Sequence, residues 1–104
     1  MRQSGTWMSI WDDRILETIR SKGPLPVGKI ADEEGVRIQQ PSVSRRCSKL
    51  ADHSLVIALG NGVYQITEQG KGYLDGEYDA ENGVWMQDGD DNGAPSAGEQ
   101  PGEI

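Results

Sequence analysis

The chain is organised around one stretch of its sequence, Pro41-Ser42-Val43-Ser44-Arg45-Arg46-Cys47-Ser48-Lys49-Leu50-Ala51. Val43, Cys47 and Leu50 recur at the i, i+4 and i+7 spacing of one face of an α-helix. Pro41 suits the first position of such a helix, where its missing N–H group costs nothing. The stretch therefore predicts an amphipathic helix. Its outer face carries the following small polar and basic residues, with Arg46 at the edge: Ser42, Arg45, Ser48 and Lys49.

The positive charge of this helix contrasts with the rest of the chain. Residues 36–51 hold four basic residues and no acid, whereas the 104 residues together carry a net charge of −7. Residues 1–79 hold ten Lys and Arg against eleven Asp and Glu, and residues 80–104 hold six acids and no base. The acidity therefore belongs mostly to the C-terminal segment. A short helix with a small, basic outer face suits the major groove of DNA, and the alternative is a solvated helix face.

Two helices are expected before the basic helix. Ser9 and Asp12 form a capping-box pattern at the start of the first, and Gly23-Pro24 ends it. The second begins at Pro26, and we expect Gly35 to close it in the left-handed conformation. The residues expected to face inward from these two helices are Trp11, Ile15, Leu16, Ile19, Val27, Ile30 and Ala31.

Two apolar runs after the basic helix predict a β-hairpin. Residues 55–59 and 63–66 flank Gly60-Asn61-Gly62, whose residues accept positive φ angles. Thr67 is expected to cap a last helix that carries Tyr73 and Leu74. Glycines at positions 70, 72 and 76 make this segment a poor helix former, so it must rely on packing or end early.

The chain is long enough for one domain, which we expect to span residues 1–79. Residues 80–104 contain five glycines, two prolines and no Lys or Arg, a composition typical of a disordered acidic tail. Within this tail, Val84-Trp85-Met86 is the one apolar spot, and we expect it to touch the domain loosely or not at all.

Several classes of protein are disfavoured by the composition. No apolar run approaches the roughly 20 residues of a membrane span, and no long apolar leader is present, so we expect a cytoplasmic protein. One cysteine and one histidine predict neither an internal disulfide nor a zinc site of about four ligands, and no metal or cofactor is expected. The adjacent pairs Asp12-Asp13 and Glu33-Glu34 do not face each other on a helix, so an enzyme is not expected. Cys47 is interpreted as a core residue, and His53 as a residue of the helix end.

The order of these elements, together with local motifs, resembles the winged-helix transcription regulators of the MarR-like kind. Val43-Ser44-Arg45-Arg46 with Leu50 is similar to the recognition-helix pattern V-S-R-R-x-x-x-L, and residues 64–70 resemble the wing exit Y-x-I-T-x-x-G. With Trp7-Met8, the resemblance narrows to small haloarchaeal proteins similar to the phage phi-H repressor and spans residues 7–79. The sequence departs from the family in two places: Val43 follows Gly35 by eight positions rather than about six, and Ser54 stands where the family often has Gly.

The resemblance implies an α+β winged helix-turn-helix fold with three helices, a two-stranded wing hairpin and a C-terminal helix. It also implies a repressor that binds double-stranded DNA. Arg45 is the best candidate to read a base edge, because Arg makes bidentate contacts to guanine. The further candidate contacts are Ser42 to a base or phosphate, Ser44, Arg46 and Lys49 to phosphates, and Asn61 at the wing tip to the minor groove or backbone.

Two matters beyond the interface follow from the same sequence. Trp7 and Met8 are expected to pack on the domain, with a place in a dimer interface as the alternative. We also expect a homodimer, because repressors usually pair two half-sites. The surfaces available for it are the apolar arm around Trp7 and the last helix with Tyr73, Leu74 and Tyr78. The excess of acids, with Arg more frequent than Lys, is compatible with a halophilic host. The alternative function is a winged-helix protein-interaction module without DNA binding, which the acidic tail and a wing without Lys or Arg from 55 to 69 would favour.

Overall fold

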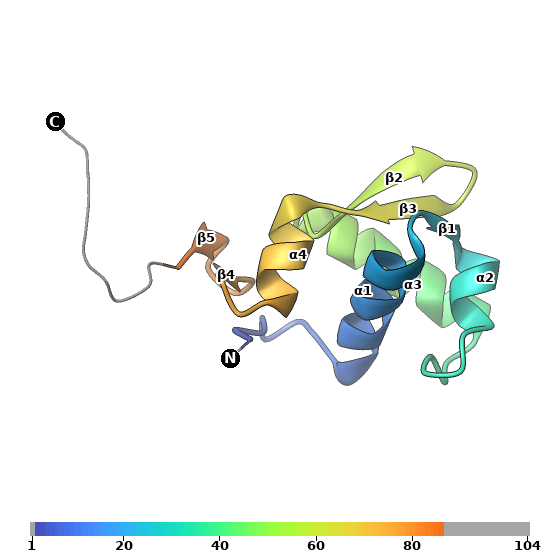
Figure 1. Cartoon of the computed structure of the whole chain (residues 1–104). Helices are drawn as coiled ribbons and strands as arrows, with labels where there is room; N and C mark the ends of the chain where they lie inside the picture. Colours follow the sequence, from blue (N-terminus) through green and yellow to red (C-terminus); the bar gives the residue numbers. More distant parts are fainter. Residues whose placement is uncertain (1, 87–104) are drawn as a thin grey trace, which may run out of the picture.

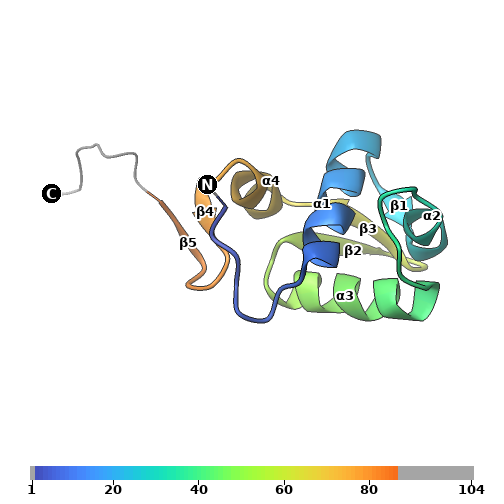
Figure 2. The same cartoon turned by 90° about the horizontal axis from the view of Figure 1, so that it is seen from below.

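The computed structural model describes residues 2–86, and its helices and strands follow the expected order (Figure 1). The helices are α1 (Ile10–Lys22), α2 (Val27–Ala31), α3 (Gln40–Asp52) and α4 (Glu68–Leu74). The strands are β1 (Leu25–Pro26), β2 (Val56–Gly60), β3 (Val63–Ile66), β4 (Tyr78–Asp79) and β5 (Val84–Trp85). The helix built from the basic stretch, α3, lies along one edge of the molecule, beneath α1 and the sheet (Figure 2).

Aliphatic side chains from α1, α2 and α3 fill the core. Val43, Cys47 and Leu50 are fully buried, as the apolar face of α3 predicts. They meet the similarly buried side chains of Ile15, Leu16, Ile19, Ile30 and Leu55. Burial raises the pKa of the Cys47 thiol to about 12, so this residue packs as a small neutral side chain.

The start of α1 differs from the expectation in one respect. The Ser9 backbone N–H donates to Asp12 Oδ2 at 2.7 Å, so the predicted cap is present. However, Asp12 rather than Trp11 points into the interior: Asp12 is fully buried and Trp11 is half-buried. The reason is a partner on α3, because the Asp12 carboxylate meets Arg46, and an isolated helix pattern cannot reveal that contact.

The connection between α2 and α3 also differs from the expectation. Helix α2 ends at Ala31, and Gly35 does not have the left-handed backbone predicted for it. Residues 32–39 form a loop that is anchored by Val36, whose side chain is buried. The extra residues of the turn are therefore taken up outside both helices, and α3 still packs against α2.

The wing is an antiparallel hairpin of β2 and β3, and β1 pairs with the other edge of β3, which gives the strand order β1-β3-β2. At its tip Asn61 has φ +56°, between two glycines that also have positive φ. Ser54, just before the wing, has φ +67°. Glycine adopts this left-handed conformation more easily than serine does, which fits the expectation that Gly is common at this position in the family that the sequence resembles.

Two glycines of α4 allow close packing that a side chain would prevent. A Cβ atom on Gly70 would lie 2.3 Å from the carbonyl oxygen of Leu55, and one on Gly72 would lie 2.3 Å from the ring of Trp85. Thr67 caps the helix, because its hydroxyl accepts from the Gly70 N–H at 3.0 Å. The low helix propensity of this segment is thus offset by tertiary contacts.

The domain does not end at residue 79 as expected. Strands β4 and β5 form an antiparallel hairpin, and the Met86 N–H donates to the Glu77 carbonyl at 2.8 Å. Trp85 meets Tyr78 edge-to-face, with ring centroids 5.0 Å apart, and covers Gly72. The expectation of disorder from residue 80 is therefore wrong for residues 80–86, because the Trp85 ring packs against Gly72, which has no side chain to block it. The remaining part of the expected tail lies outside the described residues.

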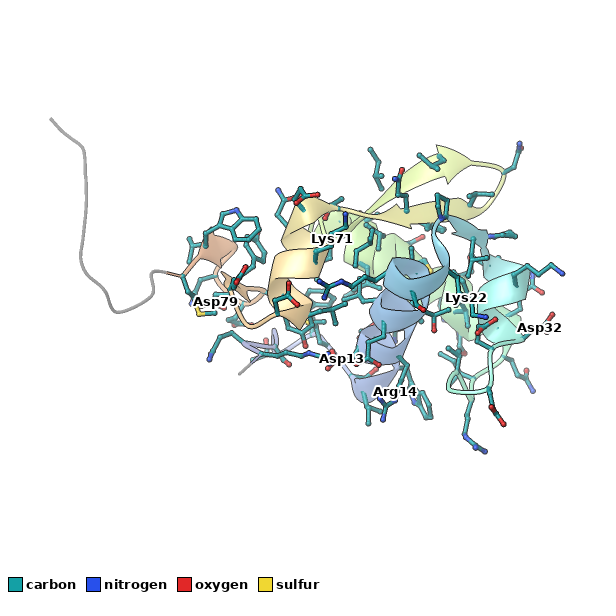
Figure 3. The ribbon with its side chains drawn as sticks, viewed as in Figure 1. Asp13, Arg14, Lys22, Asp32, Lys71 and Asp79 are labelled. Carbon is teal, nitrogen blue, oxygen red and sulfur yellow. The ribbon has the colours of Figure 1, made fainter. Side chains whose placement is uncertain are left out.

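The N-terminal arm, residues 2–9, is tied to α1, α4 and the C-terminal hairpin. The Tyr73 phenol is buried, donates to Asp13 Oδ1 at 2.6 Å and lies 2.8 Å from Ser4 Oγ. Asp13 lies on the side of α1 that faces the arm (Figure 3). It pairs there with Arg2. Burial, followed by the hydrogen bond to Asp13, raises the pKa of Tyr73 to about 12.

These contacts correct the expected dimer surface. Tyr73, Leu74 and Tyr78 are buried within the protomer, and Trp7 packs against its own core. Their apolar side chains hold the arm, α4 and the hairpin together, so they do not form a free surface.

Candidate nucleic-acid interface

The outer face of α3 presents the side chains that the sequence singled out. Arg45, Lys49 and Ser44 are exposed, and Ser42 is half-buried. Arg45 Nη2 donates to Ser42 Oγ at 3.1 Å, one helical turn away. The structure therefore brings the α3 candidates onto one element, whereas Asn61 lies at the tip of the wing.

Free positive charge is concentrated in the segment from α2 to α3. The basic side chains that pair with an acid are Arg2, Arg14, Arg20, Lys22, Arg46 and Lys71. Within residues 2–86 no acidic partner is found for Lys29, Arg37, Arg45 and Lys49. Cations without a nearby carboxylate attract an anionic ligand most strongly, so this segment is the most receptive to phosphate.

Arg46 is the one α3 candidate that is held by the domain itself. Its Nη1 lies 3.3 Å from Asp12 Oδ2 and 3.4 Å from the Trp7 carbonyl oxygen. Asp12 is fully buried, and its Oδ1 has no hydrogen-bond partner within the described residues. Burial raises the pKa of Asp12, while the Ser9 N–H and Arg46 act in the opposite direction. The pair joins α1 to α3 and fixes how α3 is presented.

Trp7 lies beside α3, in a position that the sequence did not reveal. Its indole stacks on the His53 ring, with centroids 3.9 Å apart and an interplanar angle of 11°. Trp7 and α3 enclose a groove of about 340 Å³ that is lined by Trp7, Ser42, Arg45, Arg46 and Lys49. The signal available in the sequence was an apolar Trp in an otherwise polar arm, which predicted packing on the domain but not the element it contacts.

The wing has a different character from α3. No Lys or Arg occurs between residues 55 and 69. Ile57 and Leu59 on β2 are 53% and 52% exposed, so the wing shows an apolar stripe to solvent. It can offer phosphate little electrostatic attraction.

No helix within residues 2–86 is long and apolar enough to cross a membrane. The described part of the chain also brings together no group of three or more His, Cys, Asp or Glu side chains suited to a metal ion.

A helix-turn-helix followed by a β-hairpin wing, with its free cations in the helix-turn-helix, defines a winged helix-turn-helix protein. The chain belongs to the family of winged helix-turn-helix phage repressors, whose model matches residues 1–83. A solved structure of the PhiH1 repressor-like protein from Haloarcula marismortui is 55% identical, covering 83% of this chain and 98% of that chain, with a TM-score of 0.81. No curated protein matches the chain. These findings confirm the resemblance and the fold, and they place the chain among DNA-binding regulators rather than in a class of enzymes.

Proposed function

We propose that this chain is a sequence-specific binder of double-stranded DNA that acts as a repressor and places α3 in the major groove. The observation that carries the proposal is the distribution of free cations. Within residues 2–86, the basic side chains without an acidic partner are Lys29, Arg37, Arg45 and Lys49, all between α2 and the end of α3. A helix with such an outer face fits the major groove, where bases are distinguishable by their hydrogen-bonding edges.

The α3 side chains divide into two roles. Arg45 reads a base edge, because its guanidinium is exposed on the outer face and matches the two acceptors of guanine. Ser42 meets a neighbouring base or phosphate. Because its hydroxyl accepts a hydrogen bond from Arg45, it also limits the rotamers of Arg45. Lys49, Arg46 and Ser44 meet phosphates, which set the register of the helix on the duplex.

The wing plays a smaller part in this proposal. Asn61 reaches the minor groove or the backbone from the tip of the hairpin, where its side chain is exposed. Because the wing has no basic residue, it adds shape rather than charge to the complex. If the cytoplasm is very salty, as in a halophilic archaeon, counterion release gives little affinity and direct contacts carry more of the binding.

We also propose that the working unit is a cytoplasmic homodimer. One short helix reads only a few base pairs, so a repressor gains specificity from two half-sites about one helical turn apart. Since Tyr73, Leu74 and Tyr78 are buried, the dimer must use another surface. Light scattering at tens of micromolar, with and without DNA, tests this, and a monomer mass under both conditions would reject it.

A selection of bound sequences from a random DNA pool tests the function itself. The proposal predicts an enriched motif, and a bandshift at moderate salt should show tighter binding to that motif than to a scrambled duplex. The exposed apolar stripe of Ile57 and Leu59 favours a second candidate, a protein-interaction module without DNA binding. Absence of any enrichment and of any shift would support that candidate and remove the first.

A further inference from the structure

The N-terminal arm reaches α3 because other parts of the domain hold it in place. The Ala80 N–H donates to the Gln3 carbonyl at 3.0 Å, and the Thr6 N–H donates to Glu81 Oε1 at 2.6 Å. Arg2 Nε donates to the Leu74 carbonyl at 3.0 Å. The arm then passes the C-terminal end of α3 (Figure 2). There Trp7 stacks on His53.

Gly5 determines where the Trp7 indole can lie. A Cβ atom on Gly5 would be 2.3 Å from Trp7 Nε1 and 2.7 Å from Trp7 Cδ1. Gly5 does not have a positive φ, so the demand for glycine here is steric and not conformational. The indole N–H is buried against this part of the arm and has no hydrogen-bond partner within residues 2–86. The ring therefore serves as a wall of the groove and not as a donor into it.

The groove between this wall and α3 offers a cluster of cations. Its volume of about 340 Å³ is roughly ten times the share of one water molecule in the liquid, about 30 Å³. Arg45, Arg46 and Lys49 line it, together with the hydroxyl-bearing Ser42. Arg45 and Lys49 have no acidic partner within the described residues. Because three cations and a hydroxyl line this groove, it suits a tetrahedral anion better than an uncharged ligand.

Arg46 is oriented toward this role by its own contacts. Only Nη1 is engaged, with Asp12 and with the Trp7 carbonyl oxygen. Its Nε and Nη2 groups have no partner within the described part of the chain. A guanidinium that is held on one side and free on the other is pre-organised for a bidentate contact, and its side chain is 36% exposed.

We propose that this groove binds one backbone phosphate of the DNA, gripped by Arg46 and Lys49 beside the base-reading Arg45, and that the arm is a DNA-interface element because Trp7 forms the groove wall. The inference rests on the proposed function, since it names the phosphate that docks beside α3. It assigns to Gly5 and Trp7 a role in affinity although neither carries a charge. Removing the wall lets Arg46 swing away from Trp7 and exposes the site to water.

The test compares two equivalent glycine substitutions. Gly5→Ala displaces Trp7, whereas Gly35→Ala places its methyl group where no atom lies within 4 Å and where φ is ordinary. Each phosphate contact contributes a slope of about −0.9 to log K against log salt, so losing one contact costs roughly eightfold at 0.1 M relative to 1 M. We expect Gly5→Ala to weaken DNA binding by about this factor at 0.1 M salt. The slope of log K against log salt should become shallower by about 0.9, the share of one phosphate contact. Gly35→Ala should do neither.

Two further measurements keep the outcome decisive. Arg46→Gln should reduce the slope as Gly5→Ala does, and the two changes together should do no more than either alone. Inorganic phosphate, titrated without DNA, should shift the Arg46 Nε–H and Trp7 Nε1–H resonances of the wild type in a saturable manner. In Arg46→Gln, the Trp7 Nε1–H resonance should not shift. This phosphate arm also decides the question if Gly5→Ala fails to fold.

The contrary results are equally specific. An unchanged slope in folded Gly5→Ala, or additive losses in the double variant, would overturn the phosphate groove. Failure of the wild type to bind any DNA would instead remove the proposed function, and the phosphate titration would then stand alone as a test of the groove. Phosphate shifts spread over all surface cations, without saturation at Arg46, would show that the groove has no special affinity.

Discussion

Helix α3 and the wing project from the same core, yet they offer different chemistry to a partner. The outer face of α3 has exposed cations without acidic partners in the described residues, beside a groove closed by Trp7. The wing has no Lys or Arg, and its most exposed side chains are Ile57 and Leu59. The comparison teaches that the fold alone does not say how binding is shared. In this chain the distribution of charge supports our proposal that the phosphate contacts fall on α3, with the arm supplying an uncharged groove wall and the wing a minor role.

Arg45→Ala gives the largest expected effect and tests the α3 side of this comparison. It should weaken binding to the selected sequence by about 1–3 kcal/mol and relax the preference at one base position. Affinities measured for the selected duplex and for single-base variants would show this. Arg14→Ala is the matched control, because Arg14 is an exposed arginine paired with Glu17 on α1 and away from α3. Equal losses from both variants would contradict a base-reading role.

Lys49→Ala should have a smaller and less selective effect. Because Lys49 is proposed to contact a phosphate, its loss should weaken binding to selected and random DNA alike. It should also make the slope of log K against log salt shallower by about 0.9, the share of one contact. Titrations of both duplexes between about 0.1 and 1 M salt measure this. Lys71→Ala, which removes a lysine paired with Glu68 on α4, should leave the slope unchanged. A loss confined to the selected sequence would mean that Lys49 reads a base.

Removing residues 87–104 should strengthen the binding of DNA, because this segment carries five acids and no base. Its negative charge acts on the cationic α3 more than on the neutral wing. DNA binding should tighten a few-fold at about 0.1 M salt, where the Debye length is about 10 Å, and the gain should vanish at 1 M, where it is about 3 Å. The melting temperature should stay the same, whereas truncation after Asp79 should lower it by removing β5. An equal gain at every salt concentration would rule out an electrostatic cause.

Asn61→Gly has the smallest expected effect and tests the wing side. Glycine keeps the positive φ of the turn while removing the amide side chain, so the wing should remain folded. We expect the affinity for the selected duplex to fall by about twofold, because one exposed hydrogen bond between uncharged groups lies at the low end of the net range of roughly 0.5–1.5 kcal/mol. A loss of affinity as large as that of Arg45→Ala would contradict the claim that α3 contributes more to DNA binding than the wing does.

The sequence predicted the elements whose determinants are local. The apolar stripe of α3, the Gly-Asn-Gly turn and the cap at Ser9 each depend on neighbours in the chain, and each appears where expected. Ser54 was noted only as a departure from a family that often has Gly there, and the conformation of this position, with φ of +67°, became clear from the structure.

The features that were missed depend on contacts between distant residues. Asp12 is buried because Arg46, 34 residues later, meets its carboxylate, whereas a helical pattern marks an acid as solvated. Trp85 belongs to the domain because Gly72 leaves room for its ring, although its own segment has the composition of a tail. Trp7 was expected to pack somewhere, but its stack on His53 requires Gly5 and the C-terminal hairpin to hold the arm.

Mapping the DNA-bound surface by backbone amide and indole NMR shifts tests most directly the claim that α3 and the arm carry the interface. The duplex would be the one selected from the random pool, titrated into the full chain. We predict that the largest shifts fall on residues 42–49 and on the Trp7 Nε1–H, with small shifts along β2 and β3. Largest shifts in residues 57–65, with α3 and Trp7 unmoved, would contradict the account.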